Sequence, residues 1–203
     1  MFKYLKNTIG ISIFVITIIL GVYIIDALAD NEVNLPGTVT QMPIGSQAWI
    51  DPNNVKLDDG NVATCFYSSG RTTSMIRGDN FGFAIPTDAT IDGVEFKVEK
   101  SQSASSAVDK YVYLTDSNIS FIGDNKADTG TQWTGTLTSK KYGGATDKWG
   151  TTLTPAIIND SDFGVAISAT LNNSTVSIDY LQLTVYYTTS SGEAGIVSLA
   201  PAF

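Results

Sequence analysis

Apolar and small or polar residues alternate strictly along the stretch from Phe81 to Glu99. Apolar side chains fall on every second position, first at Phe81, Phe83 and Ile85 and then, after a turn at Pro86 to Asp88, at Val94, Phe96 and Val98. A period of two residues is that of a β-strand with one buried face. Because a second sheet must cover that apolar face, the pattern predicts a β-sandwich.

Similar alternating segments recur at intervals of about 8–12 residues, separated by turn signals. Asp58 to Asn61 separates two of them and predicts a hairpin over residues 55–66. A phase change near Tyr180 predicts a β-bulge. After residue 30 the only candidate helix is one turn at Pro155 to Asn159. We therefore expect an all-β, antiparallel, jelly-roll-like sandwich of about 8–10 strands.

The composition excludes several classes of function. The 203-residue chain contains no histidine, which removes Ser-His-Asp and Cys-His catalysis and the commonest zinc ligand. Its single cysteine, Cys65, precludes an internal disulfide, and we expect a buried, unreactive thiol. The net charge of −8 argues against binding to nucleic acid or to anionic lipid, which attract clusters of Lys and Arg.

The N-terminal segment predicts export from the cytoplasm. Two lysines precede an apolar run from Thr8 to Ile25, and Ala27-Leu28-Ala29 fits the small-residue pattern of a cleavage site. The run is also long enough for a membrane anchor. Residues 1–29 are therefore either a signal peptide cleaved before Asp30 or an uncleaved anchor helix, the only contact with a membrane that we expect. Both place the remainder outside the cytoplasm, as an extracellular or cell-surface protein.

Composition also suggests the boundaries of the folded part. Residues 30–47 hold prolines and glycines without a sustained period, which predicts a linker. The sandwich is expected over residues 48–187, followed by a tail over residues 188–203. The apolar run Ile196 to Leu199 in that tail is expected along a sheet edge, of its own subunit or of a neighbouring copy.

Short motifs across residues 48–188 carry a resemblance to a known kind of module. They are Trp49 with Pro52-Asn53-Asn54, Asp58 to Thr64, Phe81 to Pro86, Ala89 to Val94, Ile122 to Ala127, Tyr142 to Gly144, Asp147, Trp149-Gly150, Phe163 to Val165, Ile178 to Tyr180 and Thr184 to Tyr187. The chain resembles a β-sandwich module of unknown function found in phage tail or virion-associated proteins and in secreted bacterial surface proteins. The resemblance implies a fold and transfers no functional residues. The signal-like N-terminus favours a surface protein.

One group of polar residues suggests a metal site. Asp51, Asp58, Asp59 and Asn61 lie close together in the sequence near a predicted turn. Carboxylate and amide oxygens are hard ligands that suit Ca²⁺, although the spacing is not that of an EF-hand. The alternative is a hairpin turn with solvated carboxylates. Calcium is the only cofactor that the sequence suggests.

A second group suggests a sugar site in the loops. Trp133, Tyr142 and Trp149 lie in loop-rich segments, with Asp147 beside the last of them. Exposed aromatic rings stack on sugars, and loops at the ends of a sandwich commonly bind ligands. The alternative is that these rings fill the core or its rim.

Three functions remain open from the sequence. The first is a non-catalytic surface structural or adhesion module, whose partners are surface glycans or other copies of itself. The second is a carbohydrate-binding module, with or without calcium. The third is a glycoside hydrolase, which needs two carboxylates facing each other across a cleft.

Overall fold

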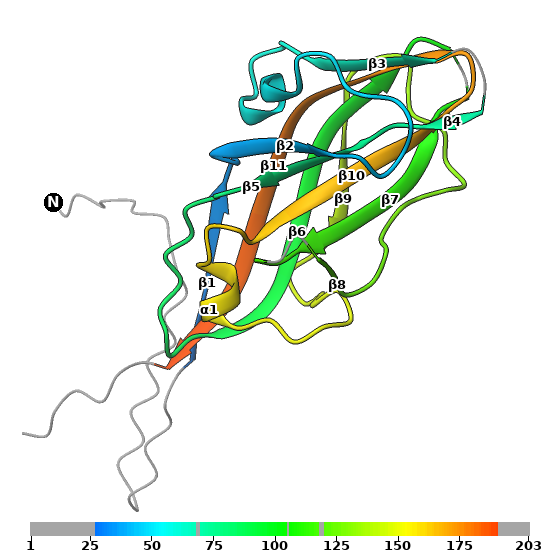
Figure 1. Ribbon diagram of the computed structural model, residues 1–203. Helices are drawn as coiled ribbons and strands as arrows, with labels where there is room; N and C mark the ends of the chain where they lie inside the picture. Colours follow the sequence, from blue (N-terminus) through cyan, green and yellow to red (C-terminus); the bar gives the residue numbers. More distant parts are fainter. Residues whose placement is uncertain (1–26, 68–69, 105, 118–119, 191–203) are drawn as a thin grey trace, which may run out of the picture.

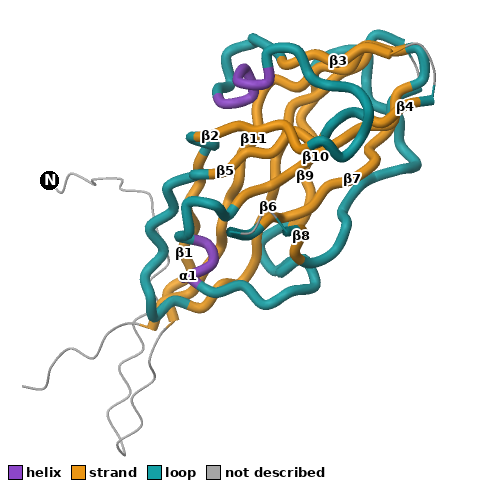
Figure 2. The backbone as a smooth tube through the Cα atoms, viewed as in Figure 1, coloured by secondary structure: helices purple, strands orange, loops and turns teal. Residues whose placement is uncertain are grey.

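The computed structural model describes residues 27–67, 70–104, 106–117 and 120–190. Within these ranges, 11 strands form two sheets in which every strand pairing is antiparallel. Figure 2 shows how little of this part of the chain is helical: the 3₁₀ helix η1 (Pro52–Lys56) and the single turn α1 (Pro155–Ile158). The all-β sandwich that the alternation predicts is confirmed.

The first sheet contains the two longest strands. Its order is β1 (Ala27–Asn34), β11 (Ser174–Ser190), β6 (Thr90–Gln102) and β9 (Thr138–Gly143), and β3 (Ala63–Tyr67) pairs with the start of β11. The second sheet has the order β2 (Thr38–Met42), β5 (Met75–Asp79), β10 (Gly164–Leu171), β7 (Val108–Thr115) and β8 (Phe121–Ile122), and β4 (Arg71–Thr72) pairs with β10. Figure 1 shows the two layers.

The core lies between the two sheets and is built from alternate residues of their strands. Val94, Phe96 and Val98 of β6 are fully buried, as are Val165 and Ile167 of β10. On β7, Val112 and Leu114 belong to the core, which leaves Tyr111 and Tyr113 on the outer face of the second sheet. The two-residue period in the sequence therefore identifies the buried side of a strand correctly where that side faces the opposite sheet.

Two local predictions are confirmed. The β11–β6 register shifts between Ile178 and Leu181, which is the predicted bulge near Tyr180. The predicted helical turn is α1, whose four residues begin after Thr154, and the Thr154 hydroxyl caps it by accepting from the backbone of Ile157.

Two other local predictions are wrong. Phe81, Phe83 and Ile85 are buried but lie outside any strand, and Asn159 bonds both backbone groups of Ile85 in place of a neighbouring strand. The hairpin expected over residues 55–66 is instead the helix η1, a turn and the strand β3. Pro52 lies in the first turn of η1, where its fixed φ favours a helix start.

The predicted domain boundaries are also corrected. Residues 27–42, assigned to the end of a leader and to a linker, form β1 and β2, which pair with β11 and β5. Most side chains of β1 are exposed, so the strand is held by backbone hydrogen bonds and carries no apolar alternation that the sequence could reveal. Within the described residues, the sandwich therefore extends over 27–190, beyond the expected range of 48–187.

Two predictions fall on residues outside the described ranges. The apolar run from Thr8 to Ile25 precedes them, and the run Ile196 to Leu199 follows them. Within the described ranges no helix has the length and apolar character needed to cross a bilayer.

Candidate functional site

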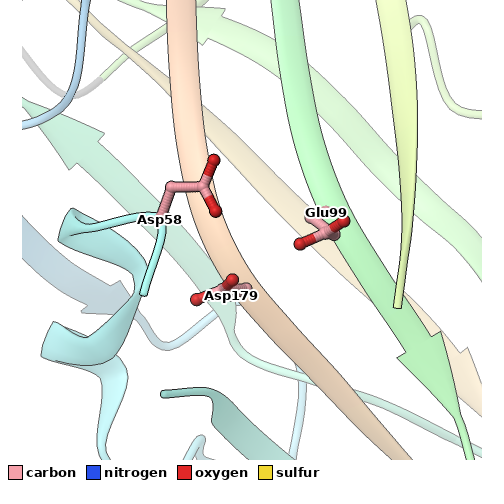
Figure 3. Close-up of side chains that lie close together, drawn as sticks. All are labelled: Asp58, Glu99 and Asp179. Carbon is pink, nitrogen blue, oxygen red and sulfur yellow. The ribbon is translucent and has the colours of Figure 1, made fainter. Parts of the chain in front are cut away.

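Three carboxylates from distant parts of the chain converge on the outer face of the first sheet. Asp58 follows η1, Glu99 lies on β6 and Asp179 lies on β11. One oxygen of each lies within 4.8 Å of the others, and Figure 3 shows the three groups pointing toward a common space. We call this group the carboxylate cluster.

Local backbone structure brings the three side chains together. Asp179 occupies the bulge of β11, beside the strand that carries Glu99. Gly60, with a φ of 81°, turns the chain so that its amide donates to Asp179 Oδ2 at 3.2 Å. That turn holds Asp58 over the two strands.

Burial and the repulsion between the three carboxylates both disfavour the ionised state of the carboxylate cluster. Asp179 is 2% exposed, and its Oδ1 has no hydrogen-bond partner within the described part of the chain. Burial raises the pKa of Asp179, although the backbone amides of Gly60 and Asp59 oppose this rise. Burial also raises the pKa of Glu99, with further contributions from Asp179 and Asp58, while Lys97 lowers it. A cation between the three groups would relieve both effects.

Of the four residues predicted to bind metal, only Asp58 belongs to the carboxylate cluster. Asp51 is exposed and precedes η1 with a φ of 52°. Asp59 accepts from the backbone and the side-chain amide of Asn61, both at 3.0 Å, so these two residues close the turn. The sequence offered no link from Asp58 to Glu99 or Asp179, because the contact depends on strand pairing.

The aromatic residues predicted to bind sugar lie in the core. Trp133, Tyr142 and Trp149 are 4%, 5% and 0% exposed, so none offers a free ring face. Trp149 Nε1 donates to the carbonyl of Val94 at 2.8 Å. Asp147 accepts from the backbone amide of Trp149 and pairs with Lys126 at 2.9 Å. These four residues hold loops onto the sandwich, which was the alternative explanation for the rings.

Two of these rings belong to a polar network between the sheets. Asp109 on β7 accepts from Trp133 Nε1 at 2.7 Å, from the Tyr142 hydroxyl at 2.6 Å and from the amide of Asp128 at 3.0 Å. Lys100 on β6 donates to the same carboxylate and to the Tyr142 hydroxyl. Burial lowers the pKa of Lys100, while Asp109 raises it. Burial and Asp109 raise the pKa of Tyr142, which keeps its hydroxyl a donor.

A cavity of about 110 Å³ adjoins this network and is lined in part by Lys100, Asp109, Trp133 and Lys140. Asp109 receives four hydrogen bonds, so its capacity as an acceptor is taken up within the protein. We interpret the network as a structural one.

A row of aromatic side chains lies on the outer face of the second sheet. The rings of Tyr111 and Tyr113, both on β7, have centroids 6.2 Å apart, and Phe121 on β8 stacks on Tyr113 at 4.8 Å. Both tyrosines are partly buried, and Phe121 is 38% exposed. Tyr111 and Tyr113 pack against Met42, Met75 and Ala166, which form an apolar cluster separate from the main core. We call Tyr111, Tyr113 and Phe121 the aromatic row.

The aromatic row is not among the sites predicted from the sequence. A signal was nevertheless present: in the segment Tyr111 to Leu114, two aliphatic residues alternate with two tyrosines. Aliphatic side chains are buried more completely than tyrosine in globular proteins, which assigns the tyrosines to the outer face.

Comparisons with known proteins find likenesses in structure but none in sequence. No family model matches the chain, and no curated protein matches it. Among solved structures, the apo form of CBM1 of BiXyn10A is 10% identical with a TM-score of 0.39, over 74% of this chain and 99% of that one. TmCBM61 in complex with beta-1,4-galactotriose is 9% identical with a TM-score of 0.37, over 77% of this chain and 86% of that one.

The matches also include other proteins. The CBM22-1 xylan-binding domain of Xyn10C from Paenibacillus barcinonensis is 10% identical with a TM-score of 0.36, over 81% of this chain and 97% of that one. An apo cyclase from Fischerella sp. has a TM-score of 0.34, at 10% identity and over 82% of this chain and 89% of that one. Likenesses this distant assign no family and no ligand. The two antiparallel sheets of the structure itself support the β-sandwich part of the predicted resemblance. No family model or curated protein extends it to phage tail or bacterial surface proteins.

Proposed function

We propose that this protein is a non-catalytic module that binds carbohydrate on the outer face of its second sheet. The observation that supports this proposal is the aromatic row of Tyr111, Tyr113 and Phe121, in which Phe121 is 38% exposed and both tyrosines are partly exposed on the outer face of the sheet. The exposed loops that the sequence favoured contribute no such surface, because their rings are buried.

The chemistry of the aromatic row suits sugars. The C–H face of a pyranose packs on an aromatic ring, and its hydroxyls need hydrogen-bonding groups at the edge of that contact. Tyrosine supplies both in one side chain. The ammonium of Lys110 lies 5.3 Å from the centre of the Tyr111 ring and adds a donor beside the row.

The spacing within the carboxylate cluster supports a binding role over glycoside hydrolysis. One oxygen of each carboxylate lies within 4.8 Å of the others. A glycosidase places its two carboxyl groups about 5–9.5 Å apart with a sugar bond between them. The cluster leaves room for an ion between its members and none for a sugar ring.

A glycan array followed by titration of the best ligand tests the proposal. With Tyr113→Ala or Phe121→Ala we expect affinity to fall about tenfold, which corresponds to a loss of about 1.4 kcal/mol. Phe66→Ala is the matched control, since Phe66 is 59% exposed on β3 of the other sheet. Binding that is unchanged in both row variants, or weakened equally in the control, would contradict the proposal. Failure of every glycan to bind would favour a structural or adhesion module instead.

The proposal includes an exported, surface location, which the N-terminal segment suggests. Its test is the intact mass and N-terminal sequence of the protein recovered from outside the cytoplasm. Cleavage before Asp30 would remove the first three residues of β1, which pair with Thr188 to Ser190. A membrane-bound product that keeps Met1 would favour the anchor.

A further inference from the structure

The carboxylate cluster contains a buried oxygen with an unused capacity to accept. Asp179 is 98% shielded from solvent, its carboxylate belongs to the cluster, and its Oδ1 has no hydrogen-bond donor among the described residues. A buried polar atom without a partner is costly and rare in native proteins. Asp58 and Glu99 cannot supply a donor while they are ionised, because a carboxylate only accepts. The partner that the site lacks is therefore a cation or a proton.

The geometry suits a cation the size of Ca²⁺. Calcium holds its oxygen ligands at about 2.3–2.6 Å, so two oxygens on opposite sides of one ion are about 5 Å apart. The three carboxylates offer one oxygen each within 4.8 Å of the others. Each can also bind through both oxygens, which would raise the ligand number toward the 6–8 that calcium takes.

The surroundings fit a hard divalent ion. The cluster has no sulfur or imidazole ligand, which disfavours zinc and copper. Lys97 lowers the pKa of Glu99, and its ammonium lies 5.1 Å from the centre of the Tyr180 ring. Asp58 is exposed, so the site opens to solvent on that side, where water can complete the coordination.

We infer that Asp58, Glu99 and Asp179 bind one calcium-class divalent cation that ties the η1–β3 turn to β6 and β11. The site lies on the first sheet and the aromatic row on the second, so the inference does not depend on carbohydrate binding. A bound ion would complete the hydrogen-bonding and charge balance of Asp179, and it would stabilise only the folded chain.

The test is thermal unfolding of the full chain in CaCl₂, in MgCl₂ and in EDTA, together with calorimetric titration of Ca²⁺. With Ca²⁺ at about 100 times Kd, mass action predicts a Tm about 5 °C or more above that in EDTA. Mg²⁺ at the same concentration should give a smaller rise, because it demands six ligands at shorter distances. A Tm that is equal in CaCl₂ and EDTA, with a flat titration, would mean that a shared proton satisfies Asp179 and would overturn the inference.

Variants locate the ion. Asp179→Asn and Glu99→Gln should abolish the calcium-dependent rise in Tm, and each should raise the Tm in EDTA by removing one repelling charge. Asp51→Asn is the matched control: it removes the same charge near η1, and asparagine tolerates the left-handed backbone of that position. A rise in Tm that survives in Asp179→Asn, or disappears in Asp51→Asn, would place the ion elsewhere and contradict the site.

Discussion

Lys100 on β6 donates a hydrogen bond to Asp109 on β7, so a buried ion pair joins the two sheets of the sandwich. Both side chains are almost completely shielded, at 8% and 1% exposed. The two side chains differ in their other hydrogen bonds. Asp109 also accepts from the indole of Trp133 and the hydroxyl of Tyr142, whereas Lys100 donates in addition to the Tyr142 hydroxyl.

Removal of Lys100 and removal of Asp109 should both destabilise the fold, but by different amounts. Lys100→Met leaves Asp109 with three neutral donors, and we expect a cost of about 3 kcal/mol. Asp109→Leu leaves the Lys100 charge, the Trp133 indole and the Tyr142 hydroxyl without their acceptor, and should cost more, about 5 kcal/mol. Urea unfolding measures both. The double variant should be more stable than Asp109→Leu alone, and equal costs for the two single variants would contradict this account.

Gly143 and Gly144 are neighbours in sequence that should respond in opposite ways to an added methyl group. At Gly143, with a φ of 73°, a Cβ would lie 2.3 Å from the carbonyl of Val94 and 2.6 Å from Trp149 Nε1, two atoms that bond to each other. Gly143→Ala should therefore cost about 2 kcal/mol or more. At Gly144 no atom lies within 4 Å of that position, and Gly144→Ala should change stability by less than about 0.5 kcal/mol. Thermal unfolding of the two variants decides the matter.

Asp128 should make the fold sensitive to acid. Lys140, which donates to it at 3.0 Å, and Thr131 lower the pKa of Asp128 to about 2. A carboxyl group whose pKa is lower when folded stabilises the fold above its unfolded pKa of about 3.9, and this contribution is lost as the pH falls through about 2. Because both side chains are partly exposed, we expect about 1 kcal/mol.

The measurement is the free energy of unfolding of wild type and Asp128→Asn across that pH range. The two should differ at pH 6 and converge toward pH 2. The Asp128 amide that donates to Asp109 belongs to the backbone, so the variant keeps that bond. A difference that is the same at both pH values would assign the effect to packing.

The Cys65 thiol should be inert in the folded protein. It is 1% exposed, and burial raises its pKa to about 11. Since the thiolate is the reactive form, a disulfide reagent at pH 8 should modify native protein only as fast as it unfolds. In denaturant the same thiol should react at the rate of an ordinary cysteine. Rapid modification of the native protein would contradict the burial of Cys65.

The sequence predicted strands well where one face is covered by the opposite sheet. In β6 and β10 that burial imposes the period of two directly on residue choice. The strand prediction was wrong at Ile85, because this residue is buried as in a strand but its backbone forms hydrogen bonds with the side chain of Asn159. It failed again at β1, because an edge strand with exposed side chains depends on backbone bonds that any sequence can make.

The candidate metal site was predictable only in part. Asp58 stood out because oxygen ligands gather near it in sequence. Asp179 carried a weaker signal, a carboxylate at the predicted bulge of an otherwise apolar strand. Glu99 had none, because it alternates with buried residues as any solvent-facing residue of β6 does. Proximity between these three residues is set by the β11–β6 register, which the pattern of one strand does not contain.

The pairing of Ala27 with Ser190 has a mechanical consequence. The chain enters and leaves the sandwich at adjacent residues of two antiparallel strands, as Figure 1 shows at the lower end of the molecule. A pull applied through these two points acts across the strands, along the hydrogen bonds between them. The hydrogen bonds between β1 and β11 would then break one after another. The force would separate β1 from the sheet before it disrupted the packing of the core.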